Sequence, residues 1–161
     1  MTDTKAVPES AIDPDVTSGV AQVLSPVIVD LTALSIDGKQ AHWHVRGDNF
    51  IAVHELLDVI VDHAREWTDM AAERVVALGL PVDARTQTIG KKANTPTMTA
   101  GFLQADVAIA EVIATMDATL GTLKTAIEAL DELDPVSQDV AIEIARGLEK
   151  DRWFLFAHLA G

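Results

Sequence analysis

With 161 residues, of which 48% are hydrophobic, the chain is long enough to bury one sizeable core. It has no cysteine, so disulfides and thiolate metal sites are excluded and any metal must be held by nitrogen and oxygen. The formal net charge of −13 disfavours binding to nucleic acid or to an anionic membrane and suits a cationic partner. Solubility or adaptation to high salt would account for the same charge.

The first fifteen residues are expected to form a flexible acidic tail. They contain two prolines and four acidic residues against a single lysine, a composition that cannot bury enough apolar surface to fold alone. They lack the basic start and apolar run of a secretory signal, and no apolar run approaches the roughly 20 residues of a membrane span. We therefore expect a cytoplasmic protein without membrane association, in which residues 16–161 form one domain.

Helical periodicity dominates the rest of the chain, and strand alternation is missing. A first helix is expected from about Val16 to Val45, kinked at Pro26. The turn over residues 46–49 should end this helix, and Asp48 or Asn49 can cap the next one.

Three further helices complete the expected fold. The second runs over residues 50–79, and residues 80–100 read as a long crossover loop. The third spans about residues 102–133, weakened by Gly121, and the fourth about residues 136–159. Four helices with one long crossover between the second and third predict an all-α, ferritin-like four-helix bundle.

The second helix has two different faces. At about 100° per residue, one face is a stripe of apolar side chains that should pack in the core: Val53, Leu57, Ile60, Ala64, Trp67, Ala71, Val75 and Leu78. Counted from His54, Asp58 lies near 40°, Asp69 near 60° and Glu73 near 100°. The helix therefore buries one side and keeps four possible metal ligands on another.

These four side chains cannot reach one ion from a single chain. Asp58 and Asp69 lie roughly 16 Å apart along the helix, whereas a metal–ligand bond is about 2 Å long. A two-fold axis near residues 63 and 64 would set His54 and Asp58 of one copy against Glu73 and Asp69 of another. The spacing thus predicts a metal site shared between subunits and repeated twice per dimer.

Imidazole and carboxylate without thiolate suit Fe(II), Mn(II) or Zn(II), and several carboxylates would also stabilise Fe(III). A single pair at i, i+4 is common on solvated helices, but two pairs on one stripe opposite an apolar stripe favour a site. Three interpretations stay open. The site binds and oxidises iron, or it only buffers zinc or manganese, or the chain is a bundle that merely oligomerises.

The segment KQAHWHVRGDNFIAVHELLDVIVDHAREWTDMAAERVVALG resembles the signature of the Dps proteins, the small ferritins of bacteria and archaea. That pattern is a His-Trp pair near the end of the first helix, then His, Asp and Asp-x-x-x-Glu at fixed spacings. The residues that match it are His42, Trp43, His54, Asp58, Asp69 and Glu73. The C-terminal GLEKDRWFLFAHLAG is also similar to the family's last helix. Where many members have Asn after the Trp, this chain has His44.

The resemblance implies a hollow homododecamer built from two-fold dimers, with an iron site at each dimer interface. It implies a ferroxidase that oxidises Fe(II), commonly with hydrogen peroxide and otherwise with dioxygen, stores ferric mineral and protects against oxidative damage. The implied ligands are His42, His54 and Asp58 of one subunit with Asp69 and Glu73 of its partner. Trp43 would trap an oxidising equivalent beside the site, or simply pack there.

Other charged residues are not expected to be metal ligands. His44, His63 and His158 are expected outside the site, as packed, surface or supporting residues. Asp62 and Arg65 lie on the metal stripe near the proposed axis, where a reciprocal ion pair across the dimer is expected.

DNA binding is not expected. The acidic tail and the single adjacent basic pair, Lys91 and Lys92, offer little to neutralise phosphate, and nucleoid association would require DNA binding. Near the junction of the last two helices, an acidic group could line a cation entry pore or form a solvated helix end: Asp131, Glu132, Asp134 and Asp139.

Overall fold

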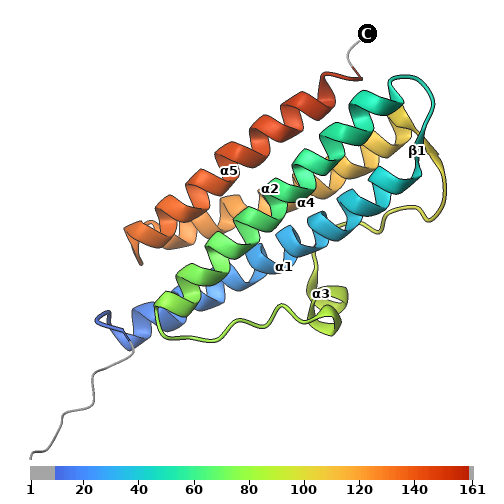
Figure 1. Ribbon diagram of the computed structural model, residues 1–161. Coiled ribbons are helices and arrows are strands. Elements are labelled where there is room, and N and C mark those ends of the chain that lie inside the picture. Colours follow the sequence, from blue (N-terminus) through green and yellow to red (C-terminus); the bar gives the residue numbers. More distant parts are fainter. Residues whose placement is uncertain (1–9, 160–161) are drawn as a thin grey trace, which may run out of the picture.

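The computed structural model describes residues 10–159, and its four long helices lie side by side along a common direction (Figure 1). These are α1 (Pro14–His44), α2 (Phe50–Ala77), α4 (Ala105–Leu130) and α5 (Pro135–Phe156). Helix α1 packs on α2 and α4, and α5 packs on α4 and α2, which closes a four-helix bundle. The expected all-α, ferritin-like arrangement is confirmed.

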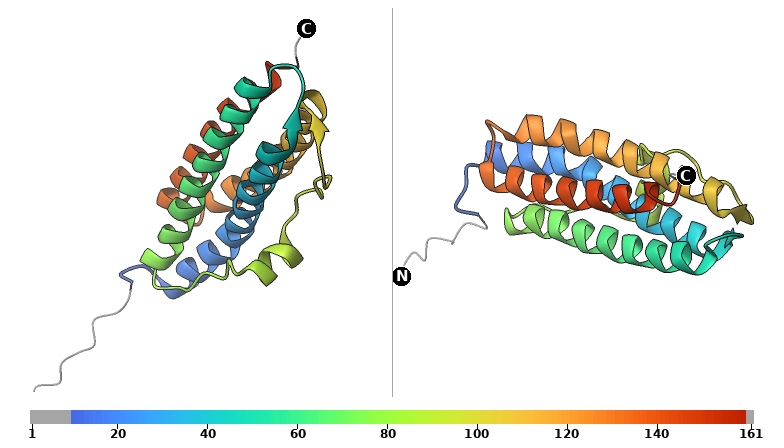
Figure 2. Two further views of the ribbon diagram at one scale, coloured as in Figure 1. Left: turned by 45° about the vertical axis from the view of Figure 1, so that its right-hand side comes forward. Right: turned by 90° about the horizontal axis from the view of Figure 1, so that it is seen from above.

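The crossover between α2 and α4 follows the length of the bundle, so that α4 starts at the same end as α2 (Figures 1 and 2). Contrary to the expectation of an unstructured loop, it contains the short helix α3 (Thr86–Lys92). Ile89 of α3 packs with Val29 and Ala33 of α1 in a small second core. Seven residues with two buried side chains are too short for periodicity to reveal a helix.

A two-stranded parallel pairing fixes the end of the crossover. Strand β1 (Val45–Arg46) directly follows α1, and β2 (Leu103–Gln104) directly precedes α4. The expectation that the chain has no strands was therefore wrong at this point, because two-residue strands show no alternation. The pairing holds the start of α4 beside the C-terminal end of α1.

The middle of the crossover is held by a buried carboxylate. Asp30 on α1 is 1% exposed, and it accepts hydrogen bonds from the backbone N–H of Asn94, at 2.8 Å, and the hydroxyl of Thr122, at 2.6 Å. A buried carboxylate needs such donors to offset the loss of its hydration. Asp30 therefore joins α1 to the crossover and to α4.

Helix α1 begins at Pro14, earlier than expected, because Asp13 caps it by accepting a hydrogen bond from the N–H of Asp15 at 2.8 Å. The helix continues through Pro26 to His44, so the proline does not interrupt it. Residues 1–9 of the expected tail lie outside the described residues.

The other helix ends also differ from expectation by a few residues. Asn49 is the N-cap of α2, but it has a left-handed backbone with φ of 59° and its side chain makes no capping bond. Helix α2 ends at Ala77, before Gly79 with φ of 86°. Asp134 caps α5 through the N–H of Ser137 at 3.0 Å.

The expected apolar stripe of α2 is buried along its whole length, from Val53 to Leu78. Helices α1 and α2 approach closely at Gly38, where an added Cβ would lie 2.9 Å from Cγ2 of Val61. This close approach matters for the site, because His42 of α1 and Asp58 of α2 lie within four residues of it.

Helix α1 is long and apolar enough to pass for a membrane span. An 18-residue stretch has a mean hydropathy of 1.6, although no such run was expected from the sequence. In the fold 56% of that stretch is buried. The core helix of a soluble bundle meets the same criterion, so this is weak evidence for a membrane.

Candidate metal centre

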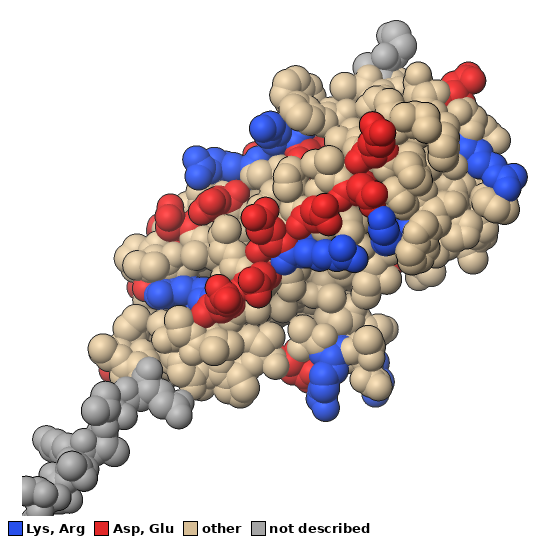
Figure 3. Space-filling view, viewed as in Figure 1, with Lys and Arg blue, Asp and Glu red and all other residues tan. Residues whose placement is uncertain are grey.

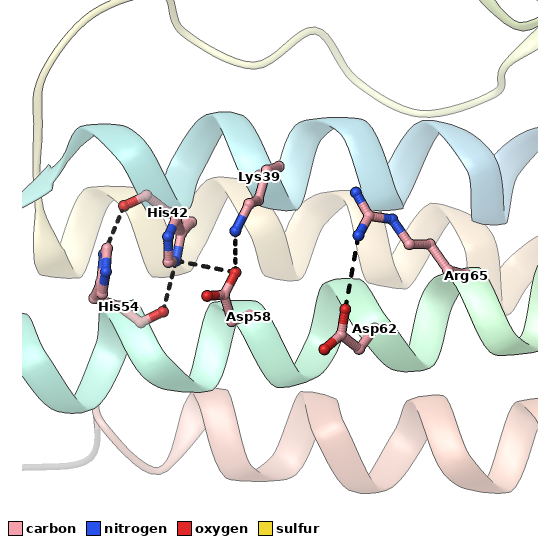
Figure 4. Close-up of polar contacts among 6 residues, drawn as sticks. All are labelled: Lys39, His42, His54, Asp58, Asp62 and Arg65. Atoms are coloured by element: carbon pink, nitrogen blue, oxygen red, sulfur yellow. Dashed lines mark hydrogen bonds and ion pairs between the residues drawn. The ribbon is translucent and has the colours of Figure 1, made fainter.

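His42 and His54 face each other across the α1–α2 contact and tie the two helices together (Figure 4). Nδ1 of His42 lies 2.8 Å from the backbone oxygen of His54, and Nδ1 of His54 lies 2.9 Å from the backbone oxygen of His42. The two rings stack with their centroids 3.6 Å apart and an interplanar angle of 21°. This reciprocal pairing fixes the orientation of both rings.

The reciprocal bonds also fix which ring nitrogens are free to bind a metal. A carbonyl oxygen only accepts, so Nδ1 of each ring must carry the hydrogen. In the neutral imidazole, Nε2 then holds the lone pair that a metal ion requires. Both rings are therefore prepared for coordination through Nε2.

Asp58, the third candidate ligand of this region, lies one turn beyond His54 on α2 and close to His42. Its Oδ1 is 3.3 Å from Nδ1 of His42. Its side chain is about half-buried, whereas His42 is 6% exposed. Two imidazoles and one carboxylate from two helices thus gather on one side of the chain.

Lys39 also reaches this group, which the sequence analysis missed. Its ammonium group contacts the carboxylate of Asp58 (Figure 4). The hydrogen bond from Lys39 is the main cause that lowers the pKa of Asp58, with smaller contributions from the nearby histidines. Lys39 precedes His42 by three residues, a spacing that places both on the same face of α1 and could have revealed it.

Asp69 and Glu73 lie further along α2, and their side chains are exposed. Asp69 and Arg65 line an open groove of about 210 Å³ between α1 and α2. Within residues 10–159 of one chain, no three His, Asp or Glu side chains lie close enough together to hold a metal ion, and this includes His42, His54 and Asp58. The five predicted ligands therefore form two sets along α2. His54 and Asp58, together with His42 of α1, form one set, and Asp69 and Glu73 form the other.

Arg65 and Asp62 lie between the two sets. In the single chain, Arg65 Nη1 is 3.7 Å from Asp62 Oδ1, and their side chains are 60% and 76% exposed (Figure 4). This pair is formed within one subunit, and the pairing expected across a dimer stays a prediction.

The remaining histidines lie away from the group. His44 bonds through Nδ1 to the backbone oxygen of Gln40 at 2.8 Å, and His158 is exposed. His63 contacts Asp151 of α5, with Nδ1 2.8 Å from Oδ2. Burial raises the pKa of Asp151, against the opposing effect of His63.

Two other predicted residues have different surroundings. Trp43 is 62% exposed, beside the buried His42. Asp134, one of the candidate pore residues, is 7% exposed and accepts a hydrogen bond from Arg74 at 2.7 Å. Its burial raises its pKa, but the bonds from Ser137 and Arg74 together outweigh this and lower it. Asp134 therefore serves as a helix cap with a bound arginine rather than as a solvated acid.

Acidic side chains form a diagonal band on the face where α2 lies toward the viewer, with basic side chains set among them (Figure 3). This distribution agrees with the net charge of −13. A band of this kind attracts cations toward the face that bears the candidate ligands.

Comparisons with known proteins agree with this architecture. A family model described as a ferritin-like domain matches residues 22–161. A DNA protection during starvation protein of Mycolicibacterium smegmatis is 34% identical over 144 residues, which cover 88% of this chain and 78% of the relative. The fine tangled pili major subunit of Haemophilus ducreyi is 32% identical over 140 residues, covering 87% of this chain and 74% of that protein.

Among solved structures, Dps from Microbacterium arborescens in the high iron form superimposes with a TM-score of 0.90 and 55% sequence identity. The match covers 94% of this chain and 99% of that one. The chain therefore belongs to the Dps proteins of the ferritin-like family.

Proposed function

We propose that this protein is a mini-ferritin that binds Fe(II) at sites shared between two subunits, oxidises it and stores the ferric product inside a dodecameric shell. The observation that carries the proposal is the reciprocal pairing of His42 and His54, which leaves Nε2 of each ring free for a metal, with Asp58 beside His42. Membership of a family associated with iron storage and protection supports it. In this proposal Fe(II) is the substrate, and the protein acts in the cytoplasm.

The exposed face of α2 is self-complementary under the proposed two-fold axis. An axis midway between residues 63 and 64 relates position i of one subunit to position 127 − i of the other. It sets His54 against Glu73, Asp58 against Asp69, and Asp62 against Arg65. Each ligand thus meets a ligand, and Asp62 meets the base Arg65 near the axis.

The same relation pairs two exposed apolar residues at the ends of the stripe. Ile51 is 61% exposed and Val76 is 59% exposed, and they are also related by the axis. Both lie on the metal-bearing side of α2, at about 60° and 40° from His54. Contact between them would bury apolar surface at both ends of the interface.

The ligand chemistry fits iron oxidation. Two imidazoles and one carboxylate from one subunit, with Asp69 and Glu73 from the other, hold Fe(II) and stabilise Fe(III). Two Fe(II) ions give one electron each to hydrogen peroxide, which takes up two protons and leaves as two waters. Removing ferrous iron and peroxide together prevents radical formation, and dioxygen is the alternative oxidant. Exposed Trp43 lies beside His42 and could trap a stray oxidising equivalent.

Subunit mixing tests the shared site directly. Asp58→Ala and Glu73→Ala should each abolish accelerated oxidation when assembled alone, because each removes one ligand from every site. Random co-assembly of the two variants makes half of the dimers mixed, and each mixed dimer has one intact site of two. We therefore expect about a quarter of wild-type activity to return.

The measurement adds Fe(II) anaerobically, then peroxide, and follows ferric absorbance through size exclusion. A closed shell of twelve 17.2 kDa subunits elutes at about 206 kDa. No recovery in mixed assemblies would contradict a shared site. Intact shells that bind zinc or manganese but oxidise iron no faster than buffer would favour the metal-buffering alternative.

A further inference from the structure

A cavity of about 640 Å³ lies between α1 and the crossover, and none of the five candidate metal ligands lines it. Its apolar walls come from α1, from α3 and from the loop that follows α3, and they include Ala33, Ile36, Ile89, Pro96 and Met98. The crossover passes beside α1 (Figure 1), so the cavity forms where this segment docks on the helix. Its volume and its largely apolar walls are typical of sites that bind small organic molecules.

Asp37 is the only ionisable side chain that lines this cavity, and it is partly buried. Burial raises the pKa of its carboxyl, and no hydrogen bond or neighbouring charge within residues 10–159 opposes the rise. Asp30 lies two turns earlier on the same face of α1, yet it accepts two hydrogen bonds. A partly buried carboxylate without a partner is unfavourable. A cation that enters the cavity would therefore stabilise the charge of Asp37.

The apolar walls and the other polar groups of the cavity indicate what kind of cation fits. Ile36, next to Asp37, is 53% exposed although it lines the cavity, and a hydrocarbon body packed on it would remove this apolar surface from water. An ammonium group has three N–H donors. The carboxylate of Asp37 can accept one of them, and side-chain oxygens of Gln40 and Thr97 line the same cavity and can accept the others.

We propose that this cavity binds a small organic ammonium ion, whose charged group pairs with Asp37 and whose hydrocarbon body packs on the apolar walls. The net charge of −13 favours a cationic ligand over an anionic ligand of the same size. This binding does not depend on the proposed iron chemistry, because Asp37 lies about 140° around α1 from His42. It is a function beyond the oxidation and storage of iron.

Three probes and three variants separate the charge of Asp37 from the space of the cavity. The probes are 2-phenylethylammonium, the neutral 2-phenylethanol and the anionic 3-phenylpropionate, which share a phenyl ring on a short chain. Asp37→Asn removes the charge and keeps the shape, and Asp48→Asn, at an exposed position before α2, is the matched control. Gly90→Leu should reduce the cavity, because Gly90 lines it and an added Cβ there meets no atom within 4 Å.

Isothermal titration calorimetry of the assembled wild-type protein should show saturable binding of one 2-phenylethylammonium ion per subunit. Asp48→Asn should bind this ion with the affinity of the wild type. Asp37→Asn should bind it about tenfold more weakly, because a hydrogen bond between two charged groups is lost. Gly90→Leu should weaken the binding of 2-phenylethylammonium and of 2-phenylethanol alike, and 3-phenylpropionate should not bind.

The outcomes distinguish this inference from the proposed function. Absence of saturable binding by the wild type would overturn it, and so would equal affinity of the wild type and Asp37→Asn for 2-phenylethylammonium. Equal affinity of the wild type for the ammonium ion and the alcohol would overturn it as well, without any variant. Iron oxidation should be unchanged in Asp37→Asn, and none of these outcomes bears on the shared metal site.

Discussion

At the scale of single residues, the contact between His63 and Asp151 shows how a hydrogen bond stabilises a buried carboxylate away from the metal centre. Asp151 is 4% exposed, and His63 contributes a hydrogen bond across the α2–α5 contact. Burial raises the pKa of Asp151, while His63 opposes the rise. A raised carboxyl pKa favours folding at low pH, and this contribution is lost as pH rises through the folded-state value.

His63→Leu should therefore lower the free energy of unfolding near neutral pH by about 1–2 kcal/mol, since a bond to a buried carboxylate is lost and the imidazole is partly screened by water. Without His63, the pKa of Asp151 rises further. The destabilisation should shrink as pH falls toward the ordinary aspartate value near 3.9, because protonated Asp151 no longer needs its partner.

Denaturant unfolding of the wild type and variant at several pH values measures this difference. Asp151→Asn is the companion variant, and in its background the effect of His63→Leu should lose its pH dependence. A destabilisation by His63→Leu that is the same at every pH would show that the two groups do not interact as described.

The candidate ligands could be predicted from the sequence because spacing along one helix converts directly into direction. His54, Asp58, Asp69 and Glu73 all lie on α2, and their stripe follows from about 100° per residue. The bond from His63 to Asp151 joins residues 88 positions apart, so no local pattern contains it. Likewise, the contact of Lys39 with Asp58 depends on how α1 and α2 are placed against each other.

At the scale of whole elements, the packing of α5 on α2 depends on a glycine, which has no side chain. Gly147 of α5 faces the ring of Trp67 of α2, and an added Cβ would collide with that ring. Gly121 of α4 has no atom within 4 Å of the corresponding position. Both glycines lie in helix interiors, but there is room for an added methyl group at Gly121 and none at Gly147.

Gly147→Ala should destabilise the protein by about 1–3 kcal/mol, the usual range for overpacking a close contact. Gly121→Ala should stabilise it by up to about 1 kcal/mol, because alanine is the better helix former and meets nothing. Thermal unfolding of both variants beside wild type measures the two shifts. Equal shifts of the same sign would contradict the difference in packing.

The four long helices could be predicted because each has a buried stripe with helical period, and only their ends were misjudged by a few residues. The start of α1 moves to Pro14 because Asp13 caps it, a contact that a search for apolar periodicity does not weigh. Helix α3 and the β1–β2 pairing exist because the crossover docks on α1 and meets its end. Their stability comes from tertiary contacts, so their own sequences carry little signal.

At the scale of the whole molecule, the expected role of Arg65 is to hold two subunits together. Within one chain its pair with Asp62 is exposed at 3.7 Å, a geometry that contributes at most about 1 kcal/mol. Arg65→Ala should therefore weaken dimer association more than it slows iron oxidation per assembled site. Arg146→Ala, at an exposed position of α5, is the matched control. Sedimentation measures the change, and unchanged association of Arg65→Ala would refute the pairing across the dimer.

The net charge of −13 per chain should keep the assembled protein from DNA at physiological salt. The exposed Lys91 and Lys92 of α3 supply only two charges against this excess. A mobility-shift titration should show no complex with duplex DNA. A complex that is lost when residues 1–15 are removed would show that the tail binds DNA despite its acidic residues.

The reciprocal bonds between His42 and His54 close a contact only 12 residues long, between the end of α1 and the start of α2. Such a short loop loses little entropy on closure, so this contact can form early during synthesis. All five candidate ligands fall within residues 42–73, on one helical hairpin. None of the five candidate ligands lies beyond residue 73. Grafting the exposed face of this hairpin onto another two-fold helical scaffold should therefore transfer all five candidate ligands together.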